Sequence, residues 1–71
     1  MTARELINTS ELAYHYIIRQ INVIGCAFDP EEDYDEVANT DDMRKIAEAY
    51  LESEVQLWTI YNGDRLIIYI N

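Results

Sequence analysis

The sequence predicts an α+β fold in which helices precede a C-terminal two-stranded antiparallel hairpin. Apolar residues recur at helical spacing over the first third of the chain, two acidic capping segments introduce shorter periodic stretches, and the period becomes strand-like after residue 54. The chain of 71 residues has room for one domain, residues 1–71. Its hydrophobic fraction of 49% favours a packed domain over a disordered chain.

The first predicted element is a long N-terminal helix. Thr2 is the expected N-cap, and Glu5 occupies the third helical position of a capping box. Gly25 suits the left-handed position just after a helix end. The weak helix formers at positions 8–10 leave an alternative, a break followed by a helix that restarts at Ser10. The apolar residues at helical spacing are Leu6, Ala13, Ile17, Ile21 and Ile24.

A short acidic helix is predicted over residues 30–38. Asp29 is the expected cap, Pro30 takes the first helical position, and the acidic residues that follow lie at the positive end of the helix dipole. Its apolar face would consist of Tyr34, Val37 and Ala38.

A third, amphipathic helix is predicted to follow the polar capping segment at residues 39–42 and to run to about Ser53. Its apolar residues form one stripe at helical spacing. They are Met43, Ile46, Ala47, Tyr50 and Leu51.

The predicted hairpin joins strands 55–60 and 65–70 through the turn sequence at residues 61–64. Two registers remain open. A two-residue turn places Val55 and Leu57 beside the apolar residues of the second strand, and a three-residue loop places Trp58 and Ile60 there instead. Helices can cover only one face of the hairpin, so a homodimer through the other face is expected as one way to cover it. That surface would comprise Leu57, Thr59, Ile67 and Tyr69.

Negative charge dominates the chain, with 14 Asp and Glu residues against 5 Lys and Arg residues and a net charge of -9. This balance argues against direct binding of nucleic acid and against docking on anionic membranes. No Lys or Arg lies between Arg19 and Arg44. Eight acidic residues fall in that interval: Asp29, Glu31, Glu32, Asp33, Asp35, Glu36, Asp41 and Asp42.

These eight residues, with Tyr34 as an aromatic anchor among them, are the predicted partner-binding site. In size and composition the chain resembles small acidic inhibitors that imitate nucleic acid, including phage-encoded anti-restriction and anti-CRISPR proteins, although it shares no motif with them. The resemblance implies an inhibitor or regulator that occupies the basic nucleic-acid-binding surface of a partner protein. Whether the carboxylates share one face is left open by the sequence.

Two alternative functions are compatible with the same sequence. One is an antitoxin or immunity-type partner of a basic toxin. The other is a homodimeric structural or assembly module, in which the hairpin is the functional surface and the acidic residues only keep the protein soluble.

Neither an enzyme nor a metal site is predicted. His15 and Cys26 are single residues of their kinds without a local nucleophile–base arrangement, and Cys26 is expected to be a small buried hydrophobic residue. The alternating acids that begin at Asp29 do not form an EF-hand loop, because Tyr34 and Thr40 occupy the positions that require Gly and Glu. No cofactor is therefore expected.

A soluble, cytoplasmic protein is expected. A single cysteine excludes a disulfide within the chain, and the N-terminus lacks a basic region followed by an apolar run. The longest nearly apolar stretch, residues 21–28, is too short to span a bilayer.

Overall fold

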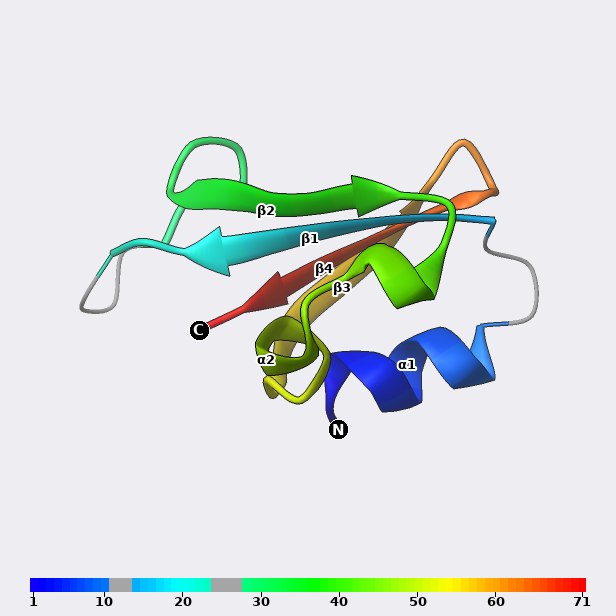
Figure 1. The fold of residues 1–71 in the computed structure, drawn as a ribbon. Coiled ribbons are helices and arrows are strands. Elements are labelled where there is room, and N and C mark those ends of the chain that lie inside the picture. Colours follow the sequence, from blue (N-terminus) through cyan, green and yellow to red (C-terminus); the bar gives the residue numbers. More distant parts are fainter. Residues whose placement is uncertain (11–13, 24–27) are drawn as a thin grey trace.

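The protein forms a four-stranded mixed β-sheet with its helical segments packed on one face, as shown by a computed structural model that describes residues 1–10, 14–23 and 28–71 (Figure 1). The predictions made for Ala13, Ile24, Gly25 and Cys26 concern residues outside these ranges. The elements in chain order are α1 (Ala3–Thr9), β1 (His15–Ile21), β2 (Tyr34–Thr40), the 3₁₀ turn η1 (Met43–Lys45), α2 (Glu48–Leu51), β3 (Val55–Tyr61) and β4 (Arg65–Ile70).

The strand order in the sheet is β2-β1-β4-β3, so that β2 and β3 are the two edge strands. The first strand, β1, runs antiparallel to β2 and parallel to β4, and β4 runs antiparallel to β3. The two edges are therefore formed by segments of opposite character: β2 lies within the acidic part of the chain, whereas β3 contains no charged residue.

The prediction of a long N-terminal helix was wrong. The capping box of Thr2 and Glu5 is present, but α1 ends at Thr9, and the following segment includes strand β1 instead of a restarted helix. β1 is a central strand, and its consecutive residues Ile17 and Ile18 are both buried, on opposite faces of the sheet. A strand buried on both faces shows a continuous apolar run, which a helical period also fits.

The prediction of a short acidic helix over residues 30–38 was also wrong, because residues 34–40 form the edge strand β2. The Asp29–Pro30 start signal produces a single turn, in which the backbone N–H of Asp33 donates to the carbonyl of Asp29 at 2.9 Å. From Tyr34 onward the backbone pairs with β1 instead of continuing the helix. Pairing with the buried strand β1 outweighs the low strand propensity of the acidic residues.

The third helix is replaced by two short elements, η1 and α2. Asp42 does act as a cap, since its carboxylate accepts a hydrogen bond from the backbone N–H of Arg44 at 3.0 Å. The backbone then becomes extended at Ile46, with φ −90° and ψ 130°, and this side chain is 5% exposed. Burial of Ile46 thus interrupts the helix that the periodicity predicted.

The C-terminal strands pair with each other, but they are half of the four-stranded sheet and do not form the separate hairpin of the predicted fold. Their register matches the three-residue loop, because Tyr61 pairs with Arg65 and Trp58 pairs with Ile68. Asn62 and Gly63 adopt left-handed backbone conformations, with φ of 56° and 76°. Glycine and asparagine tolerate this region better than other residues, which explains the tight connection.

Both faces of the sheet carry a hydrophobic cluster. On the helical side, the four largest fully buried side chains are Ile18, Leu66, Ile68 and Ile70. On the other face, Ile17, Ile67 and Tyr69 are buried and are packed by Ile21, Phe28 and Tyr34. Ile67 and Tyr69 therefore cannot form the exposed homodimer surface expected from the sequence; of that set, Leu57 and Thr59 are exposed.

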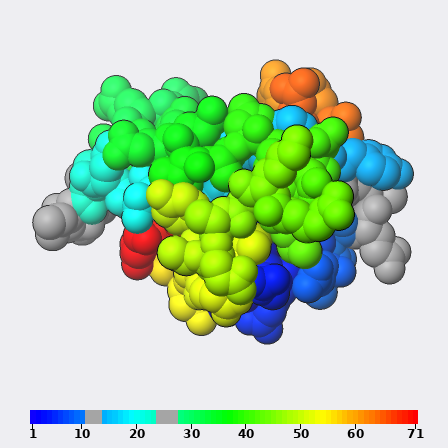
Figure 2. Space-filling view, in the orientation of Figure 1, coloured from blue at the N-terminus to red at the C-terminus, as the bar shows by residue number. Residues whose placement is uncertain are grey.

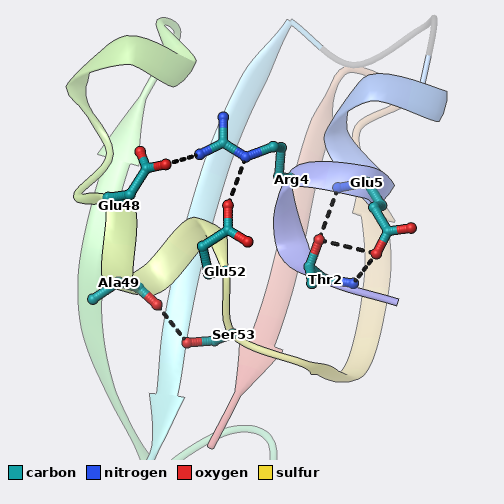
Figure 3. Close-up of polar contacts among 7 residues, drawn as sticks. All are labelled: Thr2, Arg4, Glu5, Glu48, Ala49, Glu52 and Ser53. Atoms are coloured by element: carbon teal, nitrogen blue, oxygen red, sulfur yellow. Dashed lines mark hydrogen bonds and ion pairs between the residues drawn. The ribbon is translucent and has the colours of Figure 1, made fainter.

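Arg4 joins α1 to α2 across the helical layer (Figure 3). Its guanidinium bonds both Glu48 and Glu52, with 2.9 Å between Nε and the Glu52 carboxylate. The N-terminal ammonium pairs with Glu54 at 2.7 Å, and the carbonyl of Met1 accepts from the N–H of Val55. These contacts fasten the start of the chain to α2 and to the beginning of β3.

The capping box makes part of the stability depend on pH. Hydrogen bonds from the backbone N–H and the hydroxyl of Thr2 to the Glu5 carboxylate lower the pKa of that carboxyl below its ordinary value of 4.5. Because the folded pKa is depressed, this contribution is complete above pH 4.5 and is lost as the pH falls through the folded pKa.

We therefore expect Glu5→Gln, which retains a hydrogen-bond acceptor but does not titrate, to be less stable than the native chain at pH 7 and equally stable at strongly acidic pH. Urea unfolding of both proteins between pH 7 and pH 2 measures the difference in their free energies of unfolding. A difference that stays constant down to pH 2 would contradict this assignment.

Among the described residues, no helix is long and apolar enough to cross a membrane.

Candidate functional site

The acidic residues of the predicted site gather around the β2 edge of the sheet and the turn that precedes it. Figure 2 shows the segment from residue 28 to residue 40, in green, along one side of the molecule. Five of the eight are exposed and three are half-buried. The exposed ones are Glu31, Glu32, Asp35, Glu36 and Asp41.

The three half-buried acids hold local structure together. The Asp29 carboxylate accepts from the N–H of Glu31 at 2.9 Å, and the Asp33 carboxylate accepts from the N–H of Asp29 at 2.8 Å. Asp42 caps η1 and forms a two-pronged ion pair with Arg44. These hydrogen bonds from Arg44 lower the pKa of the Asp42 carboxyl below its ordinary value. Asp29, Asp33 and Asp42 are therefore engaged in shaping the turn and the cap.

The strand geometry separates the exposed carboxylates between two faces of the sheet. Asp35 pairs with Gln20 and Glu36 pairs with Arg19 in the β1–β2 register, and neighbouring residues of a strand point to opposite faces. The single charged track that an acidic helix could present is therefore absent. Both side chains remain accessible from the open edge of β2.

The charge density of this edge is lower than that of DNA. At about 3.4 Å per residue, β2 is about 20 Å long. Duplex DNA of that length carries about twelve phosphates, more than twice the five exposed carboxylates in and around β2. The edge is strongly acidic, but it does not copy the spacing of a duplex.

Tyr34 belongs to the cluster on the helix-free face and is not an isolated anchor ringed by charge. Its ring makes an edge contact with Tyr69 at 5.9 Å between centroids, and the Arg19 guanidinium lies 4.3 Å from its centroid. Arg19 also donates to the Tyr69 hydroxyl at 2.8 Å, and that hydroxyl donates to the Pro30 carbonyl at 2.8 Å. This chain of contacts fixes the turn that carries Glu31 and Glu32 against the sheet.

Within residues 1–10, 14–23 and 28–71, no group of three or more His, Cys, Asp or Glu side chains is arranged to hold a metal ion. The His15 ring contacts the side-chain amide of Asn39, and this contact links β1 to β2.

The opposite edge of the sheet exposes a set of large apolar side chains that sequence analysis identified only in part. Leu57, Trp58, Ile60 and Tyr61 of β3 are 43–54% exposed. Leu57 was expected to be exposed, but Trp58 and Ile60 were expected in the core if the three-residue loop formed. A signal was present in the sequence: residues 55–61 carry no charge in a chain that is 27% charged.

Comparison of the chain with protein-family models, with curated protein sequences and with solved structures found no match.

Proposed function

We propose that the protein is a non-enzymatic cytoplasmic regulator that binds, through its acidic β2 edge, the basic nucleic-acid-binding surface of a partner protein. One observation carries the proposal. Ion pairs within the described residues engage Glu48, Glu52, Glu54 and Asp42, and they leave out all five exposed acids of the β2 edge. That edge therefore presents uncompensated negative charge on one side of a small molecule.

Physical chemistry favours a basic protein surface as the target. A local field of one sign steers an oppositely charged partner and speeds association, and arginine side chains form directional, two-pronged bonds with carboxylates. A surface that normally binds phosphates offers both features. Because the charge density is below that of a duplex, the edge is proposed to obstruct such a surface by electrostatic and steric exclusion.

Affinity capture with three baits tests the proposal. The first bait is the native chain, and the second carries Glu32→Gln, Asp35→Asn and Glu36→Gln on the β2 edge. The third carries Glu48→Gln, Glu52→Gln and Glu54→Gln, which changes the net charge by the same amount on the helical side. The third set is expected to cost little stability, because these ion pairs are exposed and water and salt screen them.

From nuclease-treated cell extract, the native bait and the helical-side control are expected to retain a nucleic-acid-binding protein that salt or added duplex DNA displaces. The β2-edge variant is expected to lose at least nine-tenths of that protein, equivalent to about 1.4 kcal/mol or more. Equal capture by all three baits, or capture that duplex DNA does not compete, would reject the β2 edge as the functional surface.

A further inference from the structure

The second edge strand, β3, carries a separate interaction surface. Its first residues are covered by the N-terminus, because Thr2 forms a bridge with Glu54 and the N–H of Val55 donates to the carbonyl of Met1. Beyond this point, the outer side of β3 pairs with no strand in the described part of the chain. Residues 57–61 are therefore an open strand edge.

Natural edge strands are usually protected from pairing by charged side chains, proline or short length. β3 is seven residues long and carries neither charge nor proline. A bulge is present, but it lies at the start of the strand, between Val55 and Leu57. The open part of β3 thus lacks the usual protection, although the chain as a whole is highly charged.

The exposed side chains of this edge are complementary to themselves. Thr59 lies at the centre, with Trp58 and Ile60 on the helical face of the sheet and Leu57 and Tyr61 on the other, as their pairing with β4 shows. An antiparallel pairing of two copies about a two-fold axis at Thr59 places Trp58 opposite Ile60 and Leu57 opposite Tyr61. Pairs of an aromatic with an aliphatic residue are favourable across antiparallel strands.

We propose that β3 pairs with β3 of a second copy of this chain, about a two-fold axis at Thr59, and that the dimer contains a continuous eight-stranded sheet. Each exposed apolar residue of the edge then meets an apolar residue of the other copy. A two-fold contact of this kind uses the same surface on both copies and closes on itself.

The distribution of charge permits a second copy as the occupant, although each copy carries a net charge of -9. The acidic edge β2 is at the opposite side of the sheet from β3. With strands about 4.8 Å apart, the two β2 strands of the dimer would be separated by about 34 Å. This exceeds the Debye length of about 8 Å at physiological salt, so repulsion between the acidic edges is screened.

The size of the surface predicts a weak dimer. The four half-exposed side chains offer roughly 100 Å² each, so their sum is about half of the 800 Å² per partner that a standard interface buries. Backbone pairing adds to this area. We expect a dissociation constant of the order of 10 µM, at the weak end of specific association.

Sedimentation analysis between about 1 µM and 1 mM, together with the fluorescence of the single tryptophan, tests the proposal. The native chain is expected to pass from monomer to dimer over this range, and the emission of Trp58 is expected to shift to the blue as its ring becomes buried. Thr59→Lys places two positive charges opposite each other at the axis and is expected to weaken the dimer about tenfold.

Two further samples make the test specific. Asn8→Lys adds the same charge on the exposed side of α1 and is expected to dimerise like the native chain. An equimolar mixture of Thr59→Lys and Thr59→Glu is expected to form heterodimers, because opposite charges then meet at the axis; heterodimers also show that both variants fold.

A native chain that remains monomeric at 1 mM would overturn the proposal and leave the edge for a strand of a different protein. Dimers that Thr59→Lys does not weaken, or a mixture that does not associate, would also overturn it. Pairing through β3 does not involve the acidic β2 edge, so none of these results changes the test of the proposed function.

Discussion

Replacing Ile68 with alanine is expected to remove about half of the stability of the domain. Ile68 lies on the central strand β4 and is 0% exposed, in the cluster between the sheet and the helices. Truncation of a buried isoleucine to alanine costs about 2–5 kcal/mol, because the cavity collapses only in part. A domain of this length has a total stability of about 4–10 kcal/mol. The variant is therefore expected to unfold at about half the urea concentration that unfolds the native chain.

Urea unfolding at 1 µM, below the expected dimer range, measures this effect. Ile60→Ala removes the same atoms from an edge-strand position that is 43% exposed, and it is expected to cost about 1 kcal/mol. Similar losses for the two variants would contradict the placement of β4 at the centre of the core.

Replacing Tyr69 with phenylalanine is expected to loosen the acidic turn from the sheet. The Tyr69 hydroxyl accepts from Arg19 and donates to the Pro30 carbonyl, each at 2.8 Å, and the residue is 4% exposed. Its removal leaves both partners without this contact, and an unsatisfied buried polar group costs about 1–3 kcal/mol. Hydrogen exchange should also become faster in residues 31–33, because the turn then loses its bond to β4.

Tyr61→Phe is the matched control, since it removes the same hydroxyl from a residue that is 54% exposed. Its effect on the free energy of unfolding should stay within about 0.5 kcal/mol. If Tyr69→Phe were equally mild and the exchange of the turn unchanged, the hydroxyl would not hold the turn in solution.

The sequence predicted where helical elements begin better than it predicted how long they are. The Thr2–Glu5 capping box and the Asp42 cap are present, but each starts a helical element much shorter than expected. A cap reports where a helix begins, whereas its length depends on tertiary contacts. Here strand pairing of residues 15–21 with both β2 and β4, which are distant in sequence, outweighs the helical period.

The candidate site was identified by composition but not by geometry. Charge counting located the acidic segment, and its exposed members do lie around one edge. It could not show that Asp35 and Glu36 point to opposite faces, because that follows from a strand and not from the expected helix. Trp58 and Ile60 were missed as exposed residues since pattern alone does not reveal how far a helical layer extends over a sheet.

Hydrogen exchange of the native chain, measured alone and with the partner recovered by affinity capture, tests most directly whether the β2 edge is the binding surface. Binding there predicts slower exchange in residues 31–40 and no change in residues 57–61 beyond that caused by dimerisation. Slower exchange confined to residues 57–61, with residues 31–40 unchanged, would show that the partner binds the apolar edge and would contradict the proposed function.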